Sequence, residues 1–482
     1  MQKSADGIVG RNPEGLNVDK VSHTMEMNYT DQKFPRGEAN IETTGGIPEE
    51  SEKAVTDNST SNGHANRQAS TLFEEILSRE NMMKAYKAVK RNQGAPGVDG
   101  MRVSEVSSYL KKNWSHIKHE LLTGKYKPKP VRRIGLRKGE GGIRKLGIPT
   151  VMDRLIQQAI LQQLQPSTDP TFSEHSYGFR PGLGTHEAVK ALKKKVEKGY
   201  EYVVDIDLEK FFDTVQHDRL MTKLKSRIAD QRVLTLIRKY LKAGVFENGV
   251  VIDSTSGVPQ GSPLSPLLSN IILDELDKEL EKRGHQFIRY ADDCNILVKS
   301  LRSGKRVLKS LTKFIETRLK LRINQEKSAV SEVGRRKFLG YTCSKWHDKI
   351  RLFISKSSVT RFKGKVRELT KIRGGVSFKQ LLAGLKPLII GWANYFKLSE
   401  SIRLLKNLDG WIRRRLRACA YSLMKTGKKR LSYFIKAGIS YDRAYKCAYS
   451  SRGIWHASRG DVMQQALSNN HLKRLGLVSL AS

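Results

Sequence analysis

Two stretches of the sequence place acidic residues where acids are unusual. FIRYADDCNILV (287–298) reads as one β-strand with the adjacent Asp292 and Asp293 in its middle. YVVDIDLEKFFD begins with a second strand, and strand alternation puts Asp205 and Asp207 on the same face of it. Neighbouring carboxylates in apolar runs repel each other and resist burial, so these acids require a compensating group.

A pair of divalent cations is the compensating group that we expect. Asp292 follows Asp207 by 85 positions, and adjacent strands of one sheet would bring the carboxylates of both motifs together. Oxygen ligands beside phosphate groups favour Mg²⁺, and two such ions activate an attacking hydroxyl and stabilise a leaving pyrophosphate. The alternative is that each acid caps a turn or pairs with Arg289 or Lys210. The joint occurrence of both motifs on a basic background favours the metal site.

The net charge indicates the partner. The chain has 88 basic and 48 acidic side chains and a net charge of +40. Residues 1–70 hold 7 basic and 11 acidic side chains, whereas residues 355–482 hold 27 basic and 5 acidic. Solubility requires a net charge of only about 2–8 for a small domain, and a larger excess repels itself unless a polyanion neutralises it. Nucleic acid is therefore the expected partner.

Periodicity and turn residues predict a mixed α/β chain. Residues 1–70 are rich in Gly, Asn, Ser, Thr and acids and are expected to be disordered. The expected elements are a helix capped at Ser70–Thr71, a loop at 93–100, a basic hairpin around GEGG, a helix VMDRLIQQAILQQLQP ended by Pro166, a strand at 202–208, a hairpin at 246–253, a helix LLSNIILDELDKELEKRG, a strand at 338–347 and a mostly helical, basic segment after 355.

Two further classes are excluded by composition. Apolar runs are too short for a transmembrane helix. The four cysteines lie far apart without a CxxC pair, which argues against a zinc knuckle or a disulfide framework and for a reducing compartment.

An ordered series of motifs resembles a known family. YADD together with DLEKFFD resembles the palm motifs of reverse transcriptases. QGAPGVDG, RKLGIPTVMDRLIQQAI, YGFRPGLGTHEAV, PQGSPLSPLLSNI, LRINQEKS and FLGY resemble, in order, the motifs of group II intron-encoded reverse transcriptases, or maturases. GLKPLIIGWANYFK is similar to their thumb, or X, domain, and KAGISYDRAYKCAYSSRGIW and NNHLKRLGLVSL to the DNA-binding end of members that lack a nuclease. The resemblance covers about residues 71–482.

The resemblance implies an α/β fold of the right-hand polymerase type. A disordered tail (1–70) would precede fingers and palm (71–350), a helical thumb or X domain (355–425) and a small basic C-terminal domain (426–482). No DNA endonuclease is expected, because the chain has no HNH-type histidine cluster and no cysteine pair after residue 430.

The same resemblance assigns the catalytic residues. Asp207, Asp292 and Asp293 match the acids that bind two Mg²⁺ ions, for which Mn²⁺ can substitute, and Leu208 belongs to the same metal site. Asp205 has no assigned ligand role. Phe212 matches the side chain under the incoming sugar, where a ring would exclude a ribose 2′-OH; without the resemblance it reads as a core aromatic.

Further residues are expected to bind the incoming dNTP. Lys138 and Arg144 flank the GEGG turn and match finger residues that hold the triphosphate, although generic backbone contact is an alternative for Lys138. Gln260 is expected to lie against the nucleotide, with Gly261 permitting close approach to the nascent base pair; a plain loop-to-helix turn is the alternative. Lys327 matches a lysine that protonates the departing pyrophosphate, or is a solvated surface residue.

Nucleic-acid contacts are expected at one loop and one basic segment. Tyr177 and Arg180 in YGFRPG match a template-contacting loop, and a purely structural turn is equally compatible with its Gly and Pro content. Trp392, Tyr395 and Phe396 fall at helical spacing and are expected in the thumb core. The basic residues expected to contact RNA are Arg413, Arg414, Arg415, Arg417, Lys428, Lys429 and Arg430.

The function implied is RNA-directed DNA polymerisation with maturase binding of intron RNA, in the bacterial cytoplasm. The partners would be template and intron RNA, a DNA primer or target and dNTPs, with no membrane; a homodimer is compatible with this. Alternatives are a domesticated reverse transcriptase in DNA repair or phage defence, and a non-catalytic RNA-binding splicing factor. The intact YADD and DLEKFFD motifs argue against the last.

Overall fold

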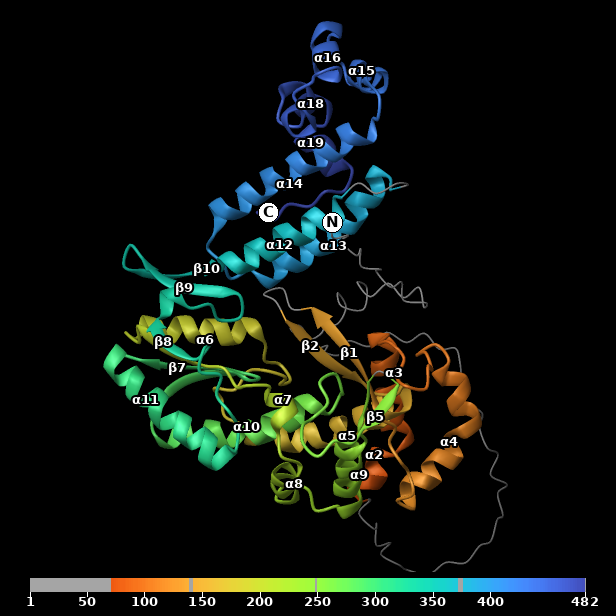
Figure 1. Cartoon of the computed structure of the whole chain (residues 1–482), viewed down its shortest axis with the longest axis vertical. Coiled ribbons are helices and arrows are strands. Elements are labelled where there is room, and N and C mark those ends of the chain that lie inside the picture. Colours follow the sequence, from red (N-terminus) through yellow and green to blue (C-terminus); the bar gives the residue numbers. More distant parts are fainter. Residues whose placement is uncertain (1–70, 138–141, 248, 372–375, 482) are drawn as a thin grey trace, which may run out of the picture. The chain divides into compact units, whose positions relative to one another are not determined.

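The computed structural model describes residues 71–137, 142–247, 249–371 and 376–481, so the expected disorder of residues 1–70 lies outside the described residues. Figure 1 shows the order of the helices and strands along the chain. The described chain divides into two compact units: unit 1 holds residues up to 188, 204–296 and 305–329, and unit 2 holds residues 189–203, 297–304 and those from 330 onward.

Unit 1 begins with two helices where the sequence predicted one. They are α2 (Leu72–Ile76) and α3 (Arg79–Asn92), and α4 (Val106–Leu122) follows. The predicted cap at Thr71 is confirmed, since its N–H donates to Glu74 Oε2 (3.2 Å). A second cap at Ser78, whose Oγ accepts from Asn81 N (3.4 Å), restarts the helix and explains the break. The expected loop at 93–100 is confirmed.

The two predicted hairpins are confirmed, and they form one sheet. β1 (Val131–Arg137) pairs antiparallel with β2 (Ile143–Ile148), and β4 (Val245–Glu247) pairs antiparallel with β5 (Val250–Ile252). A parallel pairing of β1 with β4 joins them in the order β2-β1-β4-β5. Residues 138–141, which include the first three residues of the GEGG turn, lie outside the described residues.

Helix α5 (Val151–Thr168) is buried along most of its length and packs against α3. Asn81 on α3 donates to the carbonyl of Ala159 at 3.0 Å. The expectation that Pro166 ends this helix is wrong, because Pro166 lies inside its last turn. Proline costs one backbone hydrogen bond there, and the buried apolar face of α5 offsets that loss.

The acidic motifs lie in a second sheet with the strand order β6-β7-β3-β8. Its strands are β3 (Tyr202–Ile206), β6 (Gln286–Tyr290), β7 (Asp293–Val298) and β8 (Ala329–Glu332). The predicted adjacency of the two acid-bearing segments is confirmed, because β7 neighbours β3. The prediction of a single strand over 287–298 is wrong: the segment is the hairpin β6–β7.

The other elements of the chain before β8 are helical. The predicted long helix is α10 (Ser265–Lys282), with twelve of its residues buried. The others are η1 (Asp169–Thr171), α6 (Thr185–Glu197), α7 (Phe211–Thr214), α8 (His217–Lys225), α9 (Gln231–Lys242), α11 (Leu301–Phe314) and η2 (Ile315–Leu319).

Unit 2 is mostly helical beyond the hairpin of β9 (Tyr341–Trp346) and β10 (Lys349–Ile354), as expected. Its other elements are η3 (Val333–Arg335), α12 (Lys356–Leu369), α13 (Phe378–Tyr395), α14 (Ile402–Leu423), α15 (Gly427–Lys436), α16 (Tyr441–Ala448), α17 (Ile454–Ala457), α18 (Asp461–Ala466) and α19 (Asn469–Arg474). One cluster of buried side chains extends from Phe362 to Leu480. Trp392 stacks on Phe362 with ring centroids 4.4 Å apart, which confirms its core placement.

Among the described residues, none of the helices combines the length and the apolar composition needed to cross a membrane. All four cysteines are free thiols, and Cys294, Cys343 and Cys419 are buried.

Candidate active site

The YADD acids lie at the turn of a tight hairpin. β6 ends at Tyr290 and β7 begins at Asp293, so Ala291 and Asp292 form the turn. Ala291 has a φ of +57°, in the left-handed region that residues with a Cβ rarely adopt. Such a backbone persists where surrounding contacts over-determine it, and Arg289 supplies those contacts.

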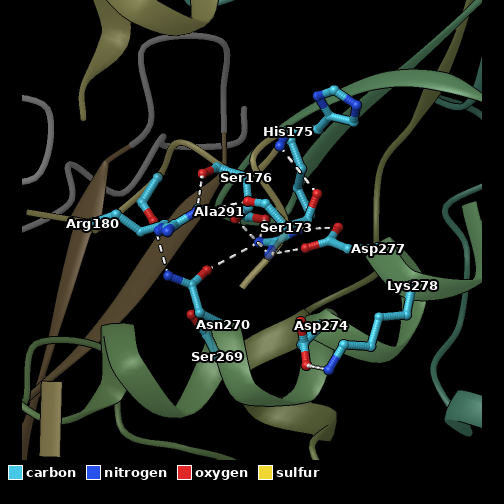
Figure 2. A network of polar contacts seen from close by, with 12 residues as sticks. Ser173, His175, Ser176, Arg180, Ser269, Asn270, Asp274, Asp277, Lys278 and Ala291 are labelled. Carbon is cyan, nitrogen blue, oxygen red and sulfur yellow. Dashed lines mark hydrogen bonds and ion pairs between the residues drawn. The ribbon is translucent and has the colours of Figure 1, made fainter. Parts of the chain in front are cut away.

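Arg289 is fully buried and every nitrogen of its guanidinium group is hydrogen-bonded. Its acceptors are both carboxylate oxygens of Asp277 (2.7 and 2.6 Å), Ser176 Oγ (2.7 Å), Asn270 Oδ1 (3.0 Å) and the carbonyl of Ala291 (2.9 Å). Figure 2 shows these four partners gathered from α10, the loop before α6 and the hairpin turn. One side chain thus ties the turn to two other segments of unit 1.

The charge of Arg289 is retained in spite of burial. Burial by itself lowers the pKa of a guanidinium, but the carboxylate of Asp277 outweighs this, so the pKa of Arg289 is raised overall. The ion pair of Arg289 is made with Asp277 and not with Asp292 or Asp293. The alternative in which Arg289 pairs with the YADD acids is therefore not the arrangement observed.

The YGFRPG loop packs directly on the hairpin. The N–H of Tyr177 donates to the carbonyl of Arg289 (2.8 Å), and the N–H of Arg289 donates to the carbonyl of His175 (2.9 Å). A Cβ at Gly178 would overlap the backbone nitrogen of Ala291, so only glycine fits there. The loop therefore supports the hairpin turn. This packing explains why residue 178 is a glycine, and no contact with a template is needed to explain it.

Arg180 in the same loop has a structural role, which favours the alternative of a purely structural turn over a template contact. It is 9% exposed and pairs with Asp169, Nε to Oδ1 at 3.0 Å. Its Nη1 donates to the carbonyls of Ser173 (2.6 Å) and Ser176 (3.0 Å). With its donors engaged inside the protein, this guanidinium is not available to a phosphate.

Asp207 follows β3 and is held by a neighbouring segment of unit 1. Its N–H donates to Ser328 Oγ (3.0 Å), and its carbonyl accepts from the N–H of Asn324 (2.9 Å). Lys327 lies on the same segment with Nζ 3.7 Å from Asp207 Oδ2. The structure thus brings Lys327 to the acids as expected, with the Lys327 side chain 63% exposed.

The four acids of the two motifs act on one another electrostatically. Burial raises the pKa of Asp293 to about 8, and the charges of Asp205, Asp292 and Asp207 add to that increase. Burial also raises the pKa of Asp292; Arg144 opposes this increase and Asp207 adds to it. The acids of the two motifs are therefore near enough to affect one another's pKa, and negative charge is in excess around them.

The donor set suits a hard divalent cation. The described residues contain no group of three or more His, Cys, Asp or Glu side chains in the arrangement of a ready-made metal site. The donors are all carboxylate oxygens, and the pKa of Asp293 is raised first by burial and then by the neighbouring negative charges, which a bound cation would compensate. Leu208 is buried beside Asp207, with its backbone bridged to Ile323. These residues fit Mg²⁺ better than a softer ion.

One of the two expected finger residues is placed at the acids. Arg144 lies on β2 opposite Leu136, is exposed, and its charge lowers the pKa of Asp292. Lys138 lies in the segment 138–141, outside the described residues.

Phe212 is 7% exposed and meets Phe211 edge to face, with centroids 5.2 Å apart. Its carbonyl accepts from the N–H of Val258 at 2.6 Å, so the PQG segment starts beside it. Both the core role and the role beneath a sugar remain compatible with this position.

The PQG segment is hydrogen-bonded to strand β2. The carbonyl of Gln260 accepts from the N–H of Gly147 at 2.7 Å. Gly261 has a φ of +109°, and a Cβ there would come 2.7 Å from the carbonyl oxygen of Gly147. The requirement for glycine at 261 therefore comes from β2, a contact that the sequence did not reveal.

Two of the basic residues expected to contact RNA are directed into unit 2. Nε of Arg417 donates to the carbonyl of Leu467 at 3.0 Å. Nε of Arg430 donates to the carbonyl of Met424 at 2.9 Å, and its guanidinium lies 4.2 Å from the ring centroid of Tyr421. These contacts tie Arg417 and Arg430 to other segments of unit 2, and their contact with RNA stays a prediction.

Two more arginines of the same segment pack on indole rings. Arg414 lies 4.0 Å from the ring centroid of Trp455 and donates to its carbonyl (3.0 Å). Arg415 lies 5.6 Å from the ring centroid of Trp411 and donates to Thr370 Oγ1 (2.8 Å). These arginines join helices of unit 2 and have only part of their surface left for RNA.

Three basic residues of the expected set keep accessible side chains. Lys428 and Lys429 are exposed in the first turn of α15, and Arg413 is half-buried on α14. Lys428 and Lys429 are therefore the most accessible of the basic residues predicted to contact RNA, and that contact stays a prediction.

Comparisons with known proteins agree with the geometry. Residues 135–343 match the family described as "Reverse transcriptase (RNA-dependent DNA polymerase)", and residues 359–434 match "Group II intron, maturase-specific domain". Protein YkfC of Escherichia coli (strain K12) is 32% identical over 303 residues, which are 55% of this chain and 80% of that protein. The group II intron-encoded protein LtrA of Lactococcus lactis subsp. cremoris is 28% identical over 406 residues, 70% of this chain and 65% of LtrA.

The chain therefore belongs to the reverse transcriptases that carry the group II intron maturase-specific domain. It is an RNA-directed DNA polymerase by family. A chain of a solved Cas6-RT-Cas1--Cas2 complex is 27% identical and is matched over 43% of its length, with 52% of this chain covered; its TM-score of 0.34 supports no further comparison.

Proposed function

We propose that this reverse transcriptase adds dNTPs to a primer 3′-OH with two Mg²⁺ ions held by Asp207, Asp292 and Asp293. The observation that carries the proposal is the adjacency of β3 and β7, together with the pKa of Asp293, which burial raises to about 8 with a further contribution from the charges of Asp205, Asp292 and Asp207. Carboxylates gathered in this way are compensated by cations at neutral pH. When bound, the ions would activate the primer hydroxyl and neutralise the charge of the departing pyrophosphate.

The cationic side chains beside the acids bind and orient the triphosphate in this proposal. Arg144 presents a planar guanidinium that binds phosphate oxygens in pairs. Lys327, 3.7 Å from Asp207 Oδ2, holds a proton where the pyrophosphate departs. Catalysis then rests on positioning and charge neutralisation.

Selection of deoxyribonucleotides is assigned to Phe212. Phe212 lies in the short helix α7, which follows Asp207 closely in the chain. The backbone carbonyl of Phe212 accepts from the N–H of Val258, just before Gln260. A ring at this place would clash with a ribose 2′-OH and leave room for a deoxyribose.

A second function, the binding of intron RNA for splicing, is favoured by the maturase-specific match over residues 359–434. We assign fingers and palm to residues 71–350, the thumb to 355–425 and a basic C-terminal DNA-binding-like domain to 426–482. The protein would act in the bacterial cytoplasm on RNA and DNA, and mobility of the intron would follow from copying its RNA.

Primer extension on poly(rA)/oligo(dT) with Mg²⁺ tests the polymerase. The wild type is expected to make cDNA and to lose activity with a chelator. Asp292→Asn is expected to abolish extension with RNA affinity nearly unchanged, whereas the surface variant Asp218→Asn keeps both. A folded, RNA-binding but inactive wild type would support a non-catalytic splicing factor instead.

Splicing of the intron that surrounds the reading frame tests the maturase. The protein is expected to bind that RNA and to promote its splicing, and Asp292→Asn should retain this activity because it needs no DNA synthesis. Absence of any intron structure in the flanking DNA would contradict the maturase role and favour a domesticated enzyme.

A further inference from the structure

Three tyrosines form an exposed ladder on α16. Tyr441, Tyr445 and Tyr449 are spaced by four residues, so their side chains lie on one face of the helix and its C-terminal end. The first pair is stacked with centroids 6.0 Å apart and an interplanar angle of 24°, and the second pair is 4.7 Å apart at 37°. The three residues are 60%, 48% and 52% exposed, so large aromatic surfaces face water.

The ladder is a built feature of unit 2. Ala444 and Ala448, each three residues after a tyrosine and on the adjoining face of α16, are completely buried, so their packing fixes the orientation of the helix. α15 packs against α16, and a Cβ at Gly427 would overlap the ring of Tyr449. Small residues beneath and beside the ladder therefore hold the rings at the surface.

The surroundings of the ladder are strongly basic. Residues 425–452 hold eight Lys and Arg and a single acid, Asp442. Lys428, Lys429 and Lys446 are exposed. Aromatic faces next to lysines match a ligand that combines flat π-systems with negative charge.

We propose that this tyrosine ladder is a stacking platform for the unpaired bases of single-stranded RNA, with the nearby lysines contacting its phosphates. Unpaired bases can stack on aromatic side chains, whereas the bases of a duplex are already stacked on one another. RNA is the strand common to both family matches, and neither match reaches residues 441–449. The proposal rests on the RNA partnership of the proposed function, and it assigns single-stranded RNA to a segment that the sequence resemblance associates with DNA binding.

Binding of a short RNA to the full-length protein tests the platform. The probe is a U-rich 12-nucleotide RNA that carries one 2-aminopurine, whose fluorescence is quenched when the base stacks. Tyr445→Ala removes the central ring and is expected to weaken binding about fivefold or more and to relieve the quenching. Tyr445→Phe keeps the ring and is expected to bind like the wild type.

The salt dependence separates stacking from charge. Tyr445→Ala should leave the slope of log Kd against log salt unchanged, because a ring releases no counterions, whereas Lys446→Ala should reduce that slope. Tyr109→Ala removes a lone tyrosine on α4 that is 37% exposed and serves as the matched control. Circular dichroism of each variant confirms that the fold is intact.

Several outcomes would overturn the proposal. The first is that Tyr445→Ala binds the RNA within twofold of the wild-type affinity. The second is that Tyr445→Ala loses as much affinity for double-stranded RNA as for single-stranded RNA. The third is that it loses affinity only for single-stranded DNA or for a protein partner. Primer extension is measured in parallel, because Tyr445→Ala should keep it on a short primed template. If the tyrosine ladder does not bind RNA, Tyr445→Ala will bind RNA like the wild type and will still extend primers. If the polymerase assignment is wrong, the wild-type protein itself will be inactive in primer extension.

Discussion

Replacement of Arg289 tests how the hairpin turn is held. Arg289→Met leaves the fully buried carboxylate of Asp277 without its partner, and it leaves the carbonyl of Ala291 without a donor. Breaking a buried ion pair in this way costs about 3–5 kcal/mol. A change of 1 kcal/mol shifts the Tm of a unit this size by about 2–4 °C, so the expected loss is roughly 6–20 °C.

The companion variant separates stability from positioning. Replacing both partners, as Arg289→Met with Asp277→Leu, removes the uncompensated charge, and such replacements are often neutral or stabilising. Most of the lost Tm should therefore return. Extension activity should stay low, because Ala291 at φ +57° still lacks the bond that fixes the turn next to Asp292.

Thermal unfolding followed by circular dichroism gives the stabilities, and primer extension well below the lowest Tm gives the activities. Recovery of activity together with Tm in the double variant would refute the positioning role. A single-variant loss below about 1 kcal/mol would refute the buried-pair reasoning.

Three other changes probe the site. Phe212→Ala should admit ribonucleotides in a primer-extension assay with rNTPs; unchanged dNTP preference would return Phe212 to a core role. Gly261→Ala should lower Tm and activity together, because its φ of +109° and its contact with β2 exclude a Cβ; wild-type values would contradict this. Lys327→Ala should slow extension by roughly 10²-fold. Its Tm should be unchanged, because its exposed contact with Asp207 contributes at most about 1 kcal/mol; wild-type rates would remove it from the mechanism.

The sequence predicted the secondary structure and the meeting of the two acidic motifs well. Strand periodicity located β3, and the adjacency of β3 and β7 brings Asp207 and Asp293 into one cluster. These predictions were correct because they depend on the local alternation of apolar and polar residues. A strand must keep its apolar face buried, so this alternation alone indicates both the strand and its orientation.

The hairpin turn escaped prediction because its cause is remote in sequence. YADD contains no glycine or asparagine that would mark a turn. Ala291 adopts a positive φ because Arg289, which binds its carbonyl, is anchored by residues of α10 and of the loop at 175–178. An arginine within an apolar strand was the available signal, since a buried charge must find a partner.

The contacts of the α14 arginines within unit 2 escaped prediction for a similar reason. A run such as RRRLR suggests a solvated charged face, yet Arg415 and Arg417 point to groups in other segments of unit 2. The direction of a long side chain is set by what packs against its helix, and composition alone does not contain that information.

The central claim is that Asp207, Asp292 and Asp293 compensate their charge with divalent cations that drive DNA synthesis. Its most direct test is Mn²⁺ binding to the full-length protein, followed by electron paramagnetic resonance in parallel with primer extension. The account predicts bound Mn²⁺ and cDNA synthesis in the wild type, and loss of both in Asp292→Asn with RNA affinity retained. Tight Mn²⁺ binding and undiminished extension in Asp292→Asn would contradict it.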